Sequence, residues 1–266
     1  MPISETIRNF AELASAKIKS MRENPVGFFI AAMLAGAYVG IGIILILSVG
    51  EHADPALRTL IMGASFSVAL TLVVFAGSEL FTGYTMYMSI GWLARKVSAG
   101  ELGLSWIVVW VGNLAGCIVL AGLAIMGAID VVSPNAELLY GIADKKIHLS
   151  ASEMIARGIL CNWLVCLALW TAARTKDDTA KLFLIFWCLF AFIASGFEHS
   201  VANMTVFALA LLSDHPETVS LIGASKNLLF VTIGNTISGT LFLGGAYWLA
   251  GASQEPDKIM EHESSD

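Results

Sequence analysis

Two apolar stretches of this sequence are too long to cross a lipid bilayer once as straight helices. Residues 59–94 and 182–213 contain 36 and 32 residues and are interrupted only at Glu79 and at the pair Glu198 and His199. Straight helices of these lengths would measure about 54 and 48 Å, whereas the hydrocarbon core of a bilayer is about 30 Å thick. Both interruptions lie beside glycine, in GSELFTG and SGFEHSV. We therefore expect each stretch to form two half-helices that meet at a break near the middle of the membrane.

The composition is that of a polytopic membrane protein. Hydrophobic residues make up 57% of the chain and charged residues 14%, and the mean hydropathy is +0.76; soluble domains usually carry about 25% charged residues. No basic patch suits a nucleic-acid partner, and the expected partner is the lipid bilayer. The fold class is therefore all-α, with six transmembrane helices of which the second and fifth are broken. The six apolar segments are Gly27–Gly50, Thr59–Ala94, Leu104–Ile129, Ser152–Ala173, Leu182–Ser213 and Asn227–Ser253.

Three regions follow from this pattern. Residues 1–24 are predicted to form a cytoplasmic amphipathic helix, residues 25–253 the six-helix transmembrane domain, and residues 254–266 a cytoplasmic tail. The first region carries apolar residues at helical spacing, which suits packing on the membrane or on a neighbouring subunit. With six spans, the side that holds both termini has ten lysines and arginines and the other side has four. The positive-inside rule therefore places both termini in the cytoplasm.

The two halves of the chain carry matching features. The acids at the breaks, Glu79 and Glu198, are 119 residues apart, and two GN pairs, at 112–113 and 234–235, are 122 apart. Three spans per half would make the second copy inverted relative to the first. Inverted repeats with matched broken helices are typical of channels and transporters, whose sites lie where the repeats meet.

The residues at the breaks suit an anion site. Thr82 and Ser200 are expected to cap the second half-helices, whose N-termini present free N–H groups and partial positive charge to a small anion. We interpret Glu79 and Glu198 as structural braces of the breaks, with a role as ion ligands as the alternative. His199 is the one histidine in a membrane segment. Intramembrane ionisable groups are more often functional than structural, although a hydrogen-bonded staple remains the alternative.

Other membrane residues allow two interpretations each. The amides of Asn113 and Asn203 suit interhelical hydrogen bonds. Lys146 is either a solvated loop charge or an attractor of anions. The four cysteines form no CxxC pair and are read as buried apolar residues, and a bis-histidine haem would need a second membrane histidine, so neither a metal nor a cofactor is expected. Several apolar residues near the breaks either pack or form a constriction that excludes water: Phe66, Leu70, Leu80, Phe81 and Phe192.

The sequence resembles the formate/nitrite transporter family over nearly its whole length, and its bacterial nitrite-channel branch in particular. The resemblance rests on NPVGFFIAAMLAGAYVGIGIIL, GSELFTG, CNWLVCLALW, FIASGFEHSVANMTVFAL and VTIGNTISG. It implies an aquaporin-like homopentamer with one pore per subunit in the bacterial inner membrane. It also implies transport of small monovalent anions and no enzymatic activity. Nitrite is the expected cargo, in keeping with nitrate assimilation, and formate and hydrosulfide are the alternatives.

The resemblance also implies roles for single residues. It assigns His199 to the pore centre, Thr82 to the break beside it and Asn162 and Asn235 to the pore wall. It assigns Lys146 to the vestibule and the five apolar residues named above to constrictions. Passive conduction and proton-coupled transport both stay open, with His199 as the group that attracts the anion or hands it a proton. A membrane redox subunit and a pore for neutral solutes are the alternative functions.

Overall fold

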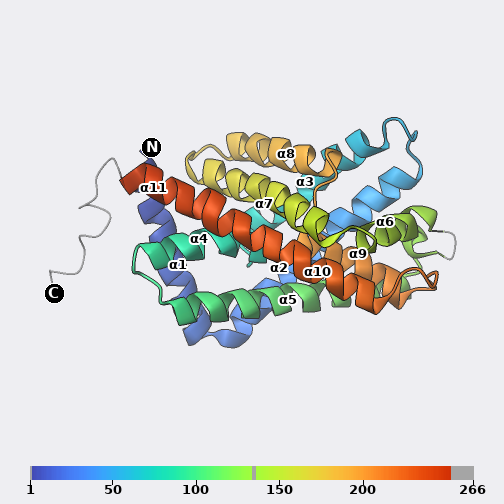
Figure 1. Cartoon of the computed structure of the whole chain (residues 1–266), viewed down its shortest axis with the longest axis horizontal. Coiled ribbons are helices and arrows are strands. Elements are labelled where there is room, and N and C mark those ends of the chain that lie inside the picture. The colour runs from blue at the N-terminus through green and yellow to red at the C-terminus, as the bar shows by residue number, and fades with distance from the viewer. Residues whose placement is uncertain (1, 134–135, 253–266) are drawn as a thin grey trace.

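The computed structural model describes residues 2–133 and 136–252, and all regular structure within them is helical (Figure 1). The expected tail, residues 254–266, lies outside these ranges. The first half of the chain forms α1 (Ile3–Glu23), α2 (Pro25–Glu51), α3 (Arg58–Ala76), α4 (Phe81–Leu93), α5 (Ala99–Met126) and the 3₁₀ turn η1 (Asp130–Val132). The second half forms α6 (Glu137–Ile147), α7 (Ala151–Ala173), α8 (Asp178–Ala194), α9 (Ser200–Leu212), α10 (Leu221–Ile237), the π-helix η2 (Ser238–Gly245) and α11 (Ala246–Ala252).

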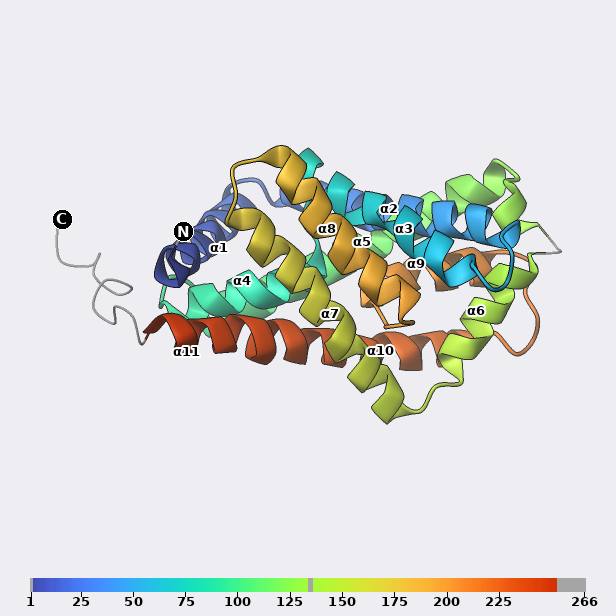
Figure 2. The ribbon, with the colours of Figure 1, turned by 90° about the horizontal axis from the view of Figure 1, so that it is seen from above.

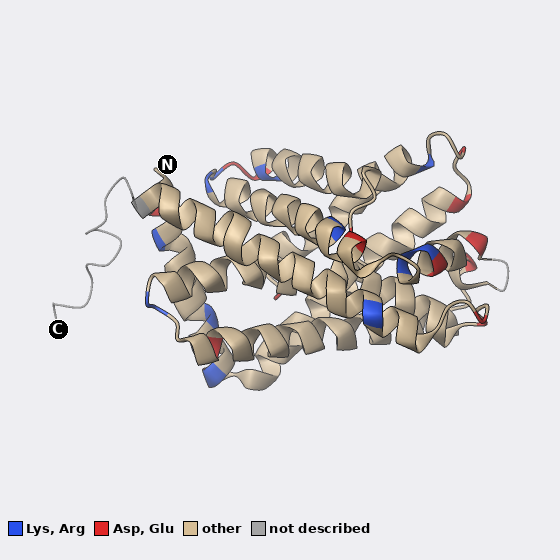
Figure 3. Ribbon diagram, viewed as in Figure 1, with Lys and Arg blue, Asp and Glu red and all other residues tan. Residues whose placement is uncertain are grey.

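The long helices run roughly along the long axis of the molecule, and charged residues concentrate toward its two ends (Figures 1 and 3). The last three elements continue one another as a single rod along one side (Figure 2). Within the described residues, five helical stretches are long and apolar enough to cross a membrane: Pro25–Glu51, Arg58–Ala76, Ala99–Met126, Ala151–Ala173 and Leu221–Gly251. Many large apolar side chains on the outside are exposed, among them Trp187 and Phe183 on α8. An apolar exterior of this kind suits a lipid environment.

Both long apolar stretches are divided where the sequence predicts a break. The first is split into α3 and α4, and the second into α8 and α9. Gly77 and Gly196 end the leading helices in the left-handed conformation, with φ of 73° and 69°, which glycine adopts without steric strain. The N–H of the next residue then donates back to the helix, from Ser78 to Val73 O at 3.1 Å and from Phe197 to Phe192 O at 3.0 Å. The glycine beside each acid is therefore the local cause of each break.

The expected caps of the trailing half-helices are wrong. Helix α4 has Leu80 as its N-cap, without a side-chain hydrogen bond, and Thr82 lies inside its first turn. Helix α9 has His199 as its N-cap, and Ser200 is its first helical residue. The imidazole Nδ1 of His199 accepts from the N–H of Ala202 at 3.1 Å. The imidazole therefore caps α9, where the sequence predicted the hydroxyl of Ser200.

The segment that holds Lys146 is helical and forms α6. Its apolar residues Leu139, Ala143 and Ile147 recur every four positions, are buried, and turn toward α9 and α10. Lys146 therefore lies in the last turn of a packed helix. At the other end of the molecule, the buried face of α1 packs on α4 and α11, where the ring of Phe10 stacks between Tyr87 and Trp170.

Glycines let α2 approach α5 at backbone contact. A Cβ on Gly116 of α5 would stand 1.8 Å from the carbonyl oxygen of Met33, and a Cβ on Gly36 of α2 would stand 2.0 Å from that of Asn113. Helices α7 and α10 approach in the same way, since a Cβ on Gly234 would stand 2.4 Å from the carbonyl oxygen of Ile155. Small residues at crossings are the usual means of close helix packing in membranes.

Gly116→Ala should destabilise the protein, because the added methyl has no space at this crossing. Overpacking of this kind typically costs about 1–3 kcal/mol, so we expect the thermal midpoint in detergent to fall by roughly 5 °C or more. Gly122→Ala on the same helix is the matched control, because a Cβ there meets nothing within 4 Å and alanine favours the helix. Equal midpoints for the two variants would contradict the packing described here.

Candidate functional site at the helix breaks

A single asparagine bridges the first break. The side chain of Asn113 on α5 accepts from the N–H of Phe81 at 2.9 Å and donates to the carbonyl oxygen of Glu79 at 2.8 Å. It also donates to the carbonyl of Ala32 on α2 at 2.7 Å, and the N–H of Glu79 reaches the carbonyl of Ala31. The main-chain polar groups of Glu79, which the break removes from any helix, are thereby paired.

A second asparagine bridges the second break in the same way. Asn235 on α10 accepts from the N–H of Ser200 at 2.9 Å and donates to the carbonyl oxygens of Glu198, at 3.1 Å, and Gly158, at 2.8 Å. The N–H of Glu198 reaches the carbonyl of Arg157. The glycine that precedes each asparagine lies at a close helix crossing, which brings the amide within reach of both the break and the neighbouring helix. The two GN pairs in the sequence are the signal of this arrangement.

Both acids at the breaks are neutralised by a lysine from outside the break. Lys146 Nζ lies 2.9 Å from Glu198 Oε1, and its side chain is 17% exposed, so it is not a solvated loop charge. The other oxygen of Glu198 accepts from Asn203 at 2.6 Å. Glu79 forms the corresponding ion pair with Lys17 of α1, and its second oxygen accepts from the hydroxyl of Tyr84 at 2.9 Å.

Sequence reasoning missed Lys17, which it treated as one of the charges that set membrane orientation. The residue sits on the amphipathic α1, four positions before the buried Met21 and one before the buried Ile18. A lysine next to the apolar face of a helix was the available signal. Its acidic partner lies 62 residues further along the chain, and local sequence does not connect the two.

His199 lies buried between the two halves of the site. Its Nε2 is 3.2 Å from Thr82 Oγ1 of the other break, and its ring stacks on Phe192 with centroids 5.9 Å apart. Since Nδ1 accepts a backbone hydrogen bond, a neutral ring carries its proton on Nε2. That proton is directed at Thr82 Oγ1, so the hydroxyl proton of Thr82 is left free to donate elsewhere. The histidine thus donates to the threonine across the two breaks, and one proton, on Thr82 Oγ1, is left for a further hydrogen bond.

Two cavities meet at His199. One, of about 180 Å³, extends from α6 and is lined by Lys145, Lys146, Arg157 and Glu198 among others; we name it the α6 vestibule. The second, of about 10 Å³, has room for about one water molecule. The vestibule and the small cavity share Phe192 and His199. The small cavity is otherwise lined by apolar residues: Val39, Phe66, Ala69, Leu70, Leu80, Val165 and Leu189.

Four of the expected site residues line neither the vestibule nor the small cavity: Thr82, Asn162, Asn235 and Phe81. Thr82 is completely buried and is in contact with His199. Asn162 and Asn235 are completely buried, and neither lines the vestibule or the small cavity. The amide of Asn162 instead donates to Thr85 Oγ1 at 2.9 Å and to the carbonyl of Asn235 at 2.6 Å. Phe81 lines a different hollow, described next. Of the residues expected at constrictions, the other four, Phe66, Leu70, Leu80 and Phe192, surround the small cavity with His199.

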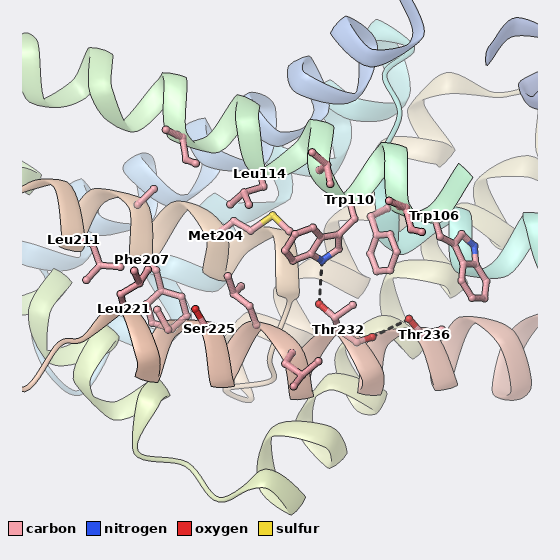
Figure 4. Close-up of a pocket in the computed structure, with 18 of the residues that line it drawn as sticks. Trp106, Trp110, Leu114, Met204, Phe207, Leu211, Leu221, Ser225, Thr232 and Thr236 are labelled. Atoms are coloured by element: carbon pink, nitrogen blue, oxygen red, sulfur yellow. Dashed lines mark hydrogen bonds between the residues drawn. The ribbon is translucent and has the colours of Figure 1, made fainter. Parts of the chain in front are cut away.

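A larger apolar groove of about 720 Å³ opens between α5 and α10, with α9 behind it (Figure 4). Trp110 Nε1 donates to Thr232 Oγ1 across it at 3.1 Å. Helix α9 contributes Met204 and Phe207 to this groove but Ala202 and Asn203 to the α6 vestibule, so it separates the two. An unsolvated anion in such an apolar groove would be strongly disfavoured.

Comparisons with known proteins agree with this architecture. The profile described as "Formate/nitrite transporter" matches residues 4–249. The nitrite transporter NirC of Salmonella typhimurium is 45% identical over 265 residues, which cover 98% of each chain. A solved structure described as an FNT family ion channel has a TM-score of 0.91 at 46% identity and covers 92% of this chain and 98% of its own. A pentameric formate channel with formate bound has a TM-score of 0.72 at 29% identity and covers 84% and 96% of the two chains.

Membrane channels and transporters, rather than enzymes, are the proteins this chain is similar to, and the profile and the relative each span nearly all of it. The chain belongs to the formate/nitrite transporter family.

Proposed function

We propose that this chain is a channel for small monovalent anions, nitrite first among them, in the inner membrane of a bacterium. The observation that carries the proposal is the shared lining at His199. A vestibule that holds three cationic side chains ends at a buried histidine, and the same histidine faces a small apolar cavity beyond it. Nitrite is favoured as cargo because the 45% identical relative is a nitrite transporter. Formate remains the second candidate, because a formate channel shares the fold.

The proposed assembly is a homopentamer in which each subunit forms its own path. Five apolar stretches are long enough to cross a membrane, and α8 with α9 supplies the sixth crossing, which makes two inverted repeats of three. The matched hydrogen bonds of Asn113 and Asn235 support this symmetry. Both termini are placed in the cytoplasm by the excess of lysine and arginine on their side of the membrane. The solved formate channel that shares this fold is pentameric.

The apolar cavity is the proposed barrier to leak. Its volume of about 10 Å³ leaves no space for a hydrated anion, so the rings of Phe66 and Phe192 and the side chains of Leu70 and Leu80 must move apart during transport. A bare charge in such surroundings is unfavourable by many kcal/mol without hydrogen bonds. The hydroxyl proton of Thr82, which the bond from His199 Nε2–H leaves free, is the donor proposed to meet the anion there.

The cap that His199 forms determines when it can transfer a proton. Protonation of Nδ1 would place two N–H groups face to face, so the imidazolium is incompatible with the α9 cap. An anion beside the ring favours the positive form. In the proposed step, the imidazolium gives one proton to nitrite, which becomes nitrous acid, and the neutral ring returns to its cap. Transport coupled to protons therefore requires reversible loosening of the first turn of α9.

Uptake by proteoliposomes tests the proposed function. Purified protein is reconstituted, and uptake of nitrite, formate and hydrosulfide is followed with and without an inward proton gradient. We expect nitrite uptake above that of empty liposomes, and acceleration by the gradient. Uptake of glycerol in place of all three anions would overturn the proposal.

His199→Asn should remove the pH dependence of transport while preserving the fold. Asparagine is among the best N-cap residues, so it can replace the histidine at Ala202 N–H, but it does not titrate. We expect an unchanged thermal midpoint and a flat profile of nitrite uptake from about pH 5 to about pH 8, where histidine normally titrates. His199→Ala, which loses the cap as well, should lower the free energy of unfolding by about 1 kcal/mol, as is typical of a lost N-cap, and the thermal midpoint should fall with it. Profiles of the same shape and height for wild type and His199→Asn would show that the histidine is only structural.

Leu80→Ala should open the apolar barrier. The smaller side chain widens the small cavity, so currents carried by anions larger than nitrite should rise severalfold in planar bilayers. Phe81→Ala is the matched control, because Phe81 is the adjacent residue in the chain but lines the apolar groove. Increased permeability in the Phe81 variant with none in the Leu80 variant would reverse the proposed assignment.

Asn235→Leu tests whether Asn235 holds the break together by hydrogen bonds or binds the anion. We propose the first role. Loss of the amide leaves the buried N–H of Ser200 and the buried carbonyl oxygen of Glu198 without a partner, at about 1–3 kcal/mol each. We therefore expect poor yield and a thermal midpoint lowered by 10 °C or so. A variant with wild-type stability and altered nitrite affinity would instead place Asn235 in the path.

A further inference from the structure

The charges of the α6 vestibule do not all remain available to a ligand. Lys146 is paired with the buried carboxylate of Glu198 at 2.9 Å, and the second oxygen of Glu198 is occupied by Asn203. The net charge of this lysine and acid is zero. The positive charge of the vestibule must therefore come from its other two cationic residues, Arg157 and Lys145.

Arg157 is the better placed of these two. It lies in the second turn of α7, its carbonyl oxygen accepts from the N–H of Glu198, and its side chain is one-third exposed and lines the vestibule. The acid next to it, Glu153, is 3.9 Å from the guanidinium and is held by the capping box of α7, where it accepts from Ser150 N–H at 2.9 Å. An exposed pair at this distance contributes little, so the guanidinium keeps N–H groups free for a ligand.

The positions at the first break that match Arg157 and Lys145 hold no cation. The N–H of Glu79 reaches the carbonyl of Ala31 as the N–H of Glu198 reaches that of Arg157, so Ala31 occupies the matching position. Lys17 is likewise preceded by Ala16, whereas Lys146 is preceded by Lys145. Both breaks have a neutralised lysine and acid, and Arg157 and Lys145 are additions to the second.

We propose that Arg157 is the residue that loads the anion at the α6 vestibule, with Lys145 in support. The proposal rests on the proposed function and adds a binding position to it. The planar guanidinium offers paired N–H donors that match the two oxygens of a small planar anion such as nitrite or formate. The anion is held there before it reaches His199, so loss of Arg157 affects loading from the α6 end alone.

The test compares Arg157→Gln, Arg157→Lys and Lys226→Gln in planar bilayers. Lys226 is an exposed cation on α10 that does not line the vestibule, so its variant reports the effect of an unrelated charge. Nitrite is added to one side at a time, and the half-saturating concentration is measured at about 10 mM and about 150 mM salt, where the screening length falls from about 30 Å to about 8 Å.

We expect Arg157→Gln to raise the half-saturating nitrite concentration about three- to tenfold at low salt, for one side only, with an unchanged maximal current. The increase should shrink at the higher salt concentration. Arg157→Lys should fall between the wild type and Arg157→Gln, because it keeps the charge but loses the paired N–H donors, and Lys226→Gln should match the wild type.

Other outcomes distinguish failure of the loading role from failure of the proposed function. Wild-type half-saturation in Arg157→Gln at low salt would overturn the loading role. A maximal current reduced equally from both sides, at both salt concentrations and in both Arg157 variants, would make the residue structural. If the wild type carries formate but no nitrite, the same comparison is made with formate. A wild type that conducts neither anion would overturn the proposed function, and this proposal with it.

Discussion

The site depends on a primary amide that pairs with both sides of a broken helix. A main-chain polar group without a partner costs several kcal/mol in hydrocarbon, so a helix can be interrupted at membrane depth only where another element supplies the missing hydrogen bonds. Asn113 and Asn235 supply them, each as acceptor and donor at once. The two breaks can therefore exist without water, and the groups that they present can face a narrow path.

The breaks place ionisable groups where a continuous helix would bury them in lipid or in its neighbours. Each acid is buried and forms an ion pair with a lysine from another helix, α1 for Glu79 and α6 for Glu198. The histidine that follows the second acid caps α9 and reaches the threonine of the other break. The proposed function gives this residue a chemical role beside its structural one, so changes at His199 must be judged by stability and by transport together.

Much of this architecture can be predicted from local sequence, because the breaks have local causes. Apolar stretches of 36 and 32 residues, each with an acid beside a glycine, indicate both interruptions, and Gly77 and Gly196 do adopt the positive φ that ends a helix. The repeated GN pairs indicate the matched crossings. The lysine partners could not be predicted in this way, because Lys17 and Lys146 lie 62 and 52 residues from their acids.

The sequence also does not predict toward which cavity a single side chain points. Leu80 and Phe81 are adjacent and both apolar, yet the first lines the cavity at His199 and the second the groove at α5. The N-cap of α9 depends on where the extended segment after Gly196 ends, and a shift of one residue decides between His199 and Ser200. Such choices follow from packing against distant helices, which propensity alone does not encode.

The pairing of each lysine with its acid also affects the response to voltage. An elementary charge that crosses 100 mV of membrane potential changes in energy by about 2.3 kcal/mol. A lysine and a glutamate that move together carry no net charge through that field, and the two such pairs here lie at opposite ends of the site. Rearrangement of the breaks would therefore transfer little gating charge. In the channel proposed above, any voltage dependence of the current should therefore arise from the anion rather than from these two ion pairs.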